Sequence, residues 1–190
     1  MLEVRPVTAE TVPDLTRLFC SHQMTENCWC LWFIIRVKDF HDGGAIVNAA
    51  KFKAFTKADP HPMGLIATDQ GDPVGWVAAG PRTRYVRAVR TPTLKSIDQS
   101  ENDSVWLVPC FFIRQDMRRR GIARRLLEGA IELAQAHAAK AIEGFPASGA
   151  KLPRTDRQVG TERLFESCGF KPVSRPSPSR VLMRRELSAA

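Results

Sequence analysis

Blocks of apolar and polar positions along the chain predict strands and helices in mixed order. The clearest block is Val105–Ile113, where nearly every residue is apolar, which predicts a strand buried on both faces. Polarity then inverts over residues 118–120, which are all arginine. Beyond them, apolar residues recur at the spacing of one helix face, at Ile122, Leu126, Leu127, Ala130, Ile131, Ala134 and Ala138. The middle of the chain therefore predicts a buried strand, a short basic loop and a long helix.

The flanking segments predict further elements of both kinds. Strands are expected over residues 2–6, 63–68, 74–79, 141–145, 170–173 and 181–185, and helices after Thr11 and over residues 45–57 and 159–168. Thr11 is the expected N-cap of the first helix, with Asp14 as its reciprocal partner. Residues 69–73 are rich in turn formers, which predicts a hairpin between the strands beside them. The length of 190 residues fits one domain, residues 1–190, with no visible repeat.

The basic loop has three properties that suit a bound anion. A helix that begins after Gly121 leaves backbone N–H groups free in its first turn, at the positive end of its dipole. Glycine lets a ligand approach the backbone closely. Five arginines within residues 118–125 add positive charge. Together they predict a phosphate-binding loop.

The residues Arg118-Arg119-Arg120-Gly121-Ile122-Ala123 resemble the [RQ]-x-x-G-x-[GA] signature of the GNAT superfamily of N-acetyltransferases. The G-x-x-x-x-G-K-[ST] and G-x-G-x-x-G patterns of other phosphate-binding loops are absent from the sequence. The resemblance implies an α/β fold of the GNAT (acyl-CoA N-acyltransferase) type, a mixed, mostly antiparallel sheet with helices on both faces. It also implies acetyl-CoA as the cosubstrate, with its pyrophosphate in this loop.

The resemblance further implies which residues bind the cofactor. The pyrophosphate would lie against Arg118, Arg119, Arg120, Gly121, Ile122, Ala123 and Arg124. Backbone groups near Phe112 and Ile113 would pair with the pantetheine arm as an added strand would. The arm would enter a gap where this strand splays from its neighbour beginning at Ala141.

A second match departs from the family pattern at a catalytic position. Residues 164–170, LFESCGF, resemble the L-Y-x-x-x-G-F segment of GNAT domains, whose Tyr often protonates the departing CoA thiolate. That position is Phe165, and the frequent Glu base is missing because residues 105–113 hold no carboxylate. Glu143, in the strand beside the expected gap, is the candidate base. The competing interpretation is a Glu on the solvent side of a short strand.

The net charge and the cysteines indicate which ligands and metal ions the protein could bind. The formal net charge of +8 suits an anionic ligand such as CoA, and would also suit nucleic acid. Nucleic acid is disfavoured because most aromatic residues lie in apolar runs and not among the basic residues. The five cysteines form neither a disulfide framework nor a paired zinc motif, so we expect free packing thiols and no metal. Basic residues 82–90 around Tyr85 predict either a closing loop or, preferably, a solvated face.

The resemblance to the GNAT superfamily implies acetyl transfer from acetyl-CoA to a primary amine of a small molecule or protein. The resemblance makes the aromatic, thiol-bearing residues 27–35 part of the acceptor pocket. The alternative is a catalytically silent acyl-CoA-binding regulator. We expect a cytoplasmic protein with no membrane partner, because the sequence has no signal pattern and no apolar run of ~18 residues. A homodimer is one possible assembly.

Overall fold

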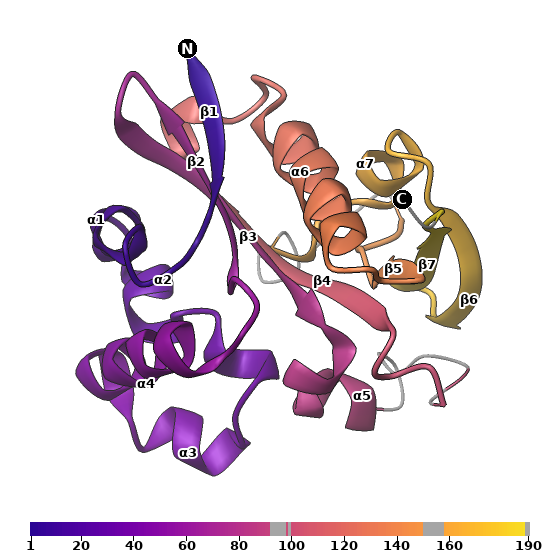
Figure 1. Cartoon of the computed structure of the whole chain (residues 1–190), viewed down its shortest axis with the longest axis horizontal. Helices are drawn as coiled ribbons and strands as arrows, with labels where there is room; N and C mark the ends of the chain where they lie inside the picture. The colour runs from indigo at the N-terminus through magenta and orange to yellow at the C-terminus, as the bar shows by residue number, and fades with distance from the viewer. Residues whose placement is uncertain (92–97, 99, 150–157, 189–190) are drawn as a thin grey trace.

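A seven-stranded sheet runs through the protein in the order β1-β2-β3-β4-β5-β7-β6 (Figure 1). The computed structural model describes residues 1–91, 98, 100–149 and 158–188. The strands are β1 (Leu2–Pro6), β2 (Gly64–Asp69), β3 (Asp72–Pro81), β4 (Val105–Ile113), β5 (Ala141–Gly144), β6 (Lys171–Ser177) and β7 (Arg180–Glu186). The β4–β5 pair is parallel and the other neighbouring pairs are antiparallel. This confirms the predicted mixed, mostly antiparallel sheet.

Helices cover both faces of the sheet. They are α1 (Val12–Cys20), α2 (Gln23–Cys28), α3 (Val37–His41), α4 (Gly44–Ala58), α5 (Val86–Arg90), α6 (Ile122–Ala136) and α7 (Glu162–Glu166), with 3₁₀ turns η1 (Leu31–Phe33), η2 (Arg82–Arg84) and η3 (Gln115–Met117). Figure 1 shows α1, α2 and α4 on one face of the sheet and α6 on the other. Among the described residues, no helix combines the length and the apolar character that a membrane crossing requires.

Strand β4 separates two hydrophobic cores, as its continuous apolar sequence predicts. Leu107, Cys110 and Phe112 face the core beneath α1 and α4. Val108 and Phe111 face the core beneath α6. The α6 face buries six of the seven apolar positions expected from the sequence, and Leu126 and Leu127 are completely buried. Ala138 was wrongly placed on this face, because the helix ends at Ala136 and Ala138 is exposed with a φ of 55°. Truncating either leucine to Ala would cost about 2–5 kcal/mol of stability.

The first helix confirms its predicted start but not its predicted cap. Thr11 makes no side-chain hydrogen bond to the helix. Its hydroxyl instead donates to the Pro6 carbonyl and accepts from the Thr8 N–H. Asp14 forms ion pairs with Arg5 and Arg17. The expected reciprocal cap is therefore wrong, because both polar side chains bind neighbours that the helix pattern does not reveal.

The predicted and observed boundaries of helices and strands differ most between residues 159 and 180. The last helix was expected over residues 159–168 and is the shorter α7, which begins after Thr161, whose side chain caps it. The hairpin of β6 and β7 extends to Ser177↔Arg180, so most of the expected connector over residues 175–180 is strand. Pairing with β7 extends a segment whose own apolar pattern is weak. The strand over residues 105–113, the helix onset at Ile122 and the helix over residues 45–57 are confirmed.

A β-bulge in β4 determines where β4 and β5 separate. Ala78 pairs with Cys110 and Gly80 with Leu107, so Val108 and Pro109 together oppose the single residue Ala79. The parallel ladder between β4 and β5 ends at Val108↔Gly144. Pro109 has no N–H to continue a ladder. Residues 109–113 of β4 therefore extend beyond their pairing with β5, as the predicted gap requires.

Candidate functional site

The loop before α6 is held between two buried side chains. Met117 and Ile122 pack into the core beneath α6, at 8 % and 3 % exposure. The residues between them are exposed. Arg119 and Gly121 adopt positive φ angles of 63° and 78°, a conformation that favours glycine. The loop is thus a strained, solvent-facing turn on fixed anchors.

Six consecutive backbone N–H groups at this turn have no acceptor among the described residues. They belong to residues 119–124, and no hydrogen bond to another described residue engages them. The first helical bond across the turn runs from the Arg125 N–H to the Gly121 carbonyl. Free N–H groups at the positive end of a fifteen-residue helix are suited to binding an anion. The turn therefore has the geometry that its sequence predicts for a phosphate site.

The five arginines of this region divide into two sets. Arg124 and Arg125 lie 2.9 and 3.1 Å from the Glu128 carboxylate. The hydrogen bond from Arg124 lowers the pKa of Glu128 below its usual value. Arg118 donates to the Ile113 carbonyl at 3.3 Å. Within the described chain, no hydrogen bond or salt bridge engages the side chains of Arg119 and Arg120. These two exposed cations are available to a ligand.

A cavity of about 330 Å³ lies on the opposite face of β4 from α6. Cys28 on α2 and Cys110 on β4 line it from two sides. Aromatic rings of the segment between α2 and α4 complete much of the wall, from Trp32, Phe33 and Phe40. Cys110 lies just beyond the β4 bulge, so this cavity borders the gap between β4 and β5.

Three thiols form a cluster in the cavity wall. The Cys30 Sγ lies 3.1 Å from the Cys110 Sγ, and the Trp76 Nε1–H donates to the Cys30 Sγ at 3.2 Å. The hydrogen bond to Cys30, together with burial, raises the pKa of Cys28 far above its usual value. All five cysteines are free. No cluster of three or more His, Cys, Asp or Glu side chains among the described residues could hold a metal ion.

Glu143 is buried in a pair of ion pairs. Its carboxylate lies 2.8 Å from the Arg82 guanidinium and 3.1 Å from that of Arg184. Only 2 % of its side chain is exposed, so the interpretation of a solvent-facing Glu is wrong. It pairs with Leu107 in the closed part of the β4–β5 ladder. Its role as base stays a prediction, and the ion pairs weigh against it because a proton would have to displace guanidinium partners.

The basic segment after β3 is solvated only in part, because Arg90 is exposed and Arg87 half-buried, whereas its first two arginines are buried. The side chains of Arg82 and Arg84 are only 1 % and 4 % exposed, and Tyr85 is completely buried. Arg84 pairs with Asp59 at 2.8 Å and donates to three backbone carbonyls. A Cβ on Gly80 would lie 2.2 Å from its guanidinium, so that glycine makes room for it. Sequence reasoning missed this burial because the partners come from distant parts of the chain.

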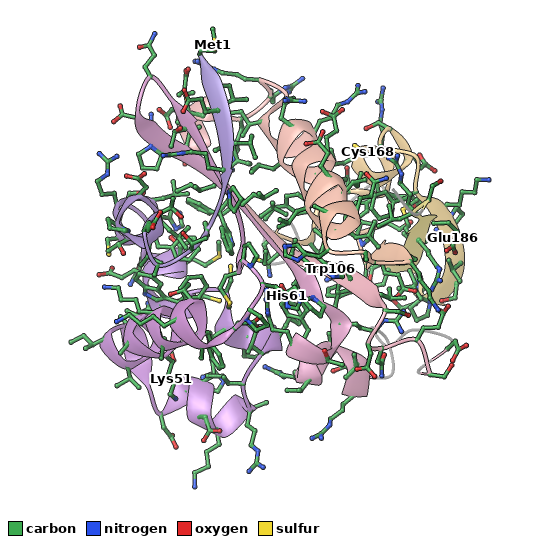
Figure 2. The ribbon with its side chains drawn as sticks, in the orientation of Figure 1. Met1, Lys51, His61, Trp106, Cys168 and Glu186 are labelled. Atoms are coloured by element: carbon green, nitrogen blue, oxygen red, sulfur yellow. The ribbon has the colours of Figure 1, made fainter. Side chains whose placement is uncertain are left out.

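A second cavity, of about 430 Å³, lies at the start of β4. His61, Trp106 and His137 line it, and Figure 2 shows His61 and Trp106 together near the centre of the molecule. The His61 and Trp106 rings are 5.7 Å apart, and His137 stacks on Trp106 at 5.4 Å. Burial and the nearby His61 hold the pKa of His137 below its usual value. Nothing in the sequence pattern brings these rings together.

Phe165 occupies the position of the missing family tyrosine. Its ring is completely buried beneath α6, and its edge lies where a Cβ on Gly144 would clash, 2.3 Å away. Phe111 and Phe170 pack against it at 6.1 and 4.9 Å.

Comparison with known proteins agrees with this geometry. A family model described as "Acetyltransferase (GNAT) family" matches residues 24–170. No curated protein matches the sequence. Among solved structures, a GNAT acetyltransferase from Streptococcus pneumoniae has a TM-score of 0.59 at 15 % identity, covering 99 % of this chain and 100 % of its own. The protein yncA from Salmonella typhimurium, solved with its cofactor acetyl-CoA, has a TM-score of 0.57 at 14 % identity, covering 100 % and 95 %. An N-acetyltransferase from Staphylococcus aureus reaches 0.60 at 11 %, covering 99 % of each chain.

Proposed function

The chain belongs to the GNAT family of acetyltransferases, and from this premise we propose that it transfers an acetyl group from acetyl-CoA to a primary amine of a small molecule or a protein. The free N–H groups of residues 119–124 at the start of α6 are the observation that carries the proposal. We propose that the whole chain is one domain built on the sheet.

The pyrophosphate of acetyl-CoA would bind in the turn before α6. The N–H groups around Gly121, Ile122 and Ala123 would donate to its oxygens, and the free cations of Arg119 and Arg120 would neutralise its charge. Arg118 and Arg124 would border the same site. Gly121 meets the backbone requirement because of its positive φ, and the space around it is open.

The pantetheine arm would lie along β4 beyond the bulge. Residues 109–113 extend past the last pair with β5, so the arm can add to this edge as a strand does. The Ile113 carbonyl already accepts a hydrogen bond from Arg118. Pairing of the arm at Ile113 would therefore exchange that bond, whereas pairing nearer Phe112 would not.

The acceptor amine would enter from the cavity beside Cys110. This would place it against the thioester in the gap, and such positioning supplies much of the rate enhancement in bimolecular reactions. A free alkyl amine has a pKa of ~10.4, so its deprotonation at neutral pH costs roughly 5 kcal/mol. Glu143 is the sequence-based candidate for accepting that proton, although it already pairs with Arg82 and Arg184. Bulk water is the competing acceptor.

A catalytically silent acyl-CoA-binding regulator is the second candidate. Phe165 favours it, because the position of the family's usual acid holds a ring that has no proton to donate. Against it, a thiolate with a pKa near ~8.5 is a tolerable leaving group that water can protonate.

Calorimetry and thiol release together test the two candidates. Saturable acetyl-CoA binding followed by amine-dependent release of CoA thiol supports the enzyme. Binding without release from any amine supports the regulator. Absence of acetyl-CoA binding would contradict both.

A further inference from the structure

We propose that the acceptor is a small primary amine carried on an apolar, uncharged body, without a second positive charge. This rests on the proposed acetyltransferase function and on the cavity bordering the β4–β5 gap as its acceptor site. Three observations lead to this class of substrate: the chemistry of the cavity wall, the Arg87 guanidinium stacked on Trp32, and the volume of the cavity.

Among the described residues, the wall offers a second ammonium group no anionic partner. Rings of Trp32, Phe33 and Phe40 and the thiols of Cys28, Cys30 and Cys110 line it, beside Met24, Asn27 and Gln158. No carboxylate lines the cavity in the part of the chain that the structure describes. A second ammonium in this space would lose water without gaining an anionic partner, which is strongly unfavourable. An apolar tail would instead contact surfaces like its own.

A fixed cation behind the wall strengthens this exclusion. The Arg87 guanidinium lies 3.6 Å from the centre of the Trp32 ring and donates to the Trp32 carbonyl at 3.0 Å. Phe40 packs edge-on against the same ring at 5.2 Å. Trp32 is thus held between a guanidinium and another aromatic ring. A positive charge on the acceptor body would be repelled by Arg87, whereas a neutral body would not be.

Size and one unsatisfied amide point to a small molecule with a hydrogen-bond donor. A volume of about 330 Å³ is near the lower limit of typical ligand sites. The Gln158 side chain also lines the cavity, and its Oε1 is buried with no hydrogen-bond donor among the described residues. The N–H of an entering amine would satisfy that oxygen after a side-chain rotation. We assign Gln158 as a positioning residue for the amine.

Hexylamine and hexamethylenediamine make a matched pair for the test, because they share a six-carbon chain and the diamine adds a second ammonium group at its far end. Release of CoA thiol from acetyl-CoA would be measured with each amine on the whole protein. We expect kcat/KM for hexylamine to exceed that for the diamine by at least about tenfold, because the second ammonium group of the diamine would be desolvated without an anionic partner. A peptide with an N-terminal Met serves as the third substrate, and we expect it to react more slowly than hexylamine.

A carboxylate in the cavity wall should weaken the preference for hexylamine over hexamethylenediamine. Cys28→Asp would give a second ammonium a partner, so the preference for hexylamine should narrow by about tenfold. Cys20→Asp is the matched control, because Cys20 is exposed on α1 and lies outside the cavity lining. Acetyl-CoA affinity, measured by calorimetry on all three proteins, shows whether each variant keeps its folded cofactor site.

The outcomes separate this inference from the function on which it rests. Turnover of the diamine or of the peptide at or above the rate of hexylamine would overturn the inference and leave acetyl transfer intact. Acetyl-CoA binding without turnover of hexylamine would also overturn it. A parent protein that binds no acetyl-CoA would refute the proposed function itself.

Discussion

The Arg82 guanidinium lies 2.8 Å from the Glu143 carboxylate, and the two side chains are only 1 % and 2 % exposed. Arg82 belongs to η2 after β3, and Glu143 to β5, so the pair links segments far apart in sequence. Arg184 on β7 approaches the same carboxylate at 3.1 Å and Glu101 at 2.7 Å. Because a buried charge without a partner is costly, these groups depend on one another.

Glu143→Gln should therefore act mainly on stability. The amide keeps the shape of the side chain but leaves the Arg82 charge without its partner, so we expect a loss of about 3 kcal/mol in the free energy of unfolding. Urea denaturation measures it, with Glu132→Gln on the exposed side of α6 as the control. A loss below about 0.5 kcal/mol would contradict the ion-pair role.

The same variant tests Glu143 as the base. A general base contributes about 10²–10⁴-fold to turnover. Because arginines already engage the carboxylate, we expect turnover per folded molecule to fall less than tenfold, with acetyl-CoA affinity retained. A fall of 100-fold or more, together with an altered pH profile, would assign proton transfer to Glu143 after all.

Gly121→Glu should abolish acetyl-CoA binding without unfolding the protein. The substitution puts a negative charge and bulk beside the free N–H groups of the α6 turn. It also strains a backbone with φ of 78°, at a cost of about 1–2 kcal/mol. Gly71→Glu is a matched control, because Gly71 has φ of 83° and open space around it, in the β2–β3 turn. Calorimetry that finds equal acetyl-CoA affinity in both variants would show that the pyrophosphate binds elsewhere.

The local pattern of apolar and polar residues was sufficient to predict β4, α6 and the turn between them, where we propose that acetyl-CoA binds. The apolar run of Val105–Ile113 and the helical spacing after Gly121 determine β4 and α6, because each element's own periodicity reports its burial. Pro109 marks the place where β4 and β5 part, a consequence of its missing N–H that the sequence contains but periodicity does not reveal.

The thiol cluster beside the proposed acceptor cavity and the buried arginines after β3 could not be predicted, because they depend on contacts between residues far apart in sequence. The Cys30 and Cys110 thiols meet across 80 positions of sequence, and Arg84 finds its partner Asp59 25 positions away. A charged run is ordinarily exposed, so the burial of Arg82 and Arg84 contradicts the usual interpretation of residues 82–90. Only the tertiary arrangement shows which arginines are structural and which are free to bind.

Cys28 and Cys30 should resist alkylation in the folded protein. The hydrogen bond to Cys30 raises the pKa of Cys28, and the hydrogen bond to Cys110 raises that of Cys30, with burial adding to both. Since the thiolate is the reactive form, we expect iodoacetamide at pH 8 to label the exposed Cys20 first. Mass spectrometry of peptides before and after denaturation measures the order. Rapid native labelling of Cys28 would mean that the thiol cluster is not formed in solution.

Tyr85 should titrate well above an ordinary tyrosine, and it can be observed without interference because the chain has one tyrosine. Burial raises its pKa to about 12, although the nearby charge of Arg84 opposes that shift. Ultraviolet titration of the folded protein at about 295 nm should therefore have its midpoint near pH 12, against ~10 in urea.

The direction of this shift also determines how stability depends on pH. A raised folded-state pKa means that the contribution of Tyr85 is fully present below pH ~10 and is lost as the pH rises toward 12. Tyr85→Phe should remove that part of the alkaline dependence. At neutral pH it should leave the unfolding free energy nearly unchanged, because the Arg84 guanidinium near the buried hydroxyl is already engaged by Asp59 and by three backbone carbonyls. Denaturation of parent and variant at pH 7 and pH 11 measures both effects. Parallel losses in the two proteins between these pH values would show that another group causes the alkaline destabilisation.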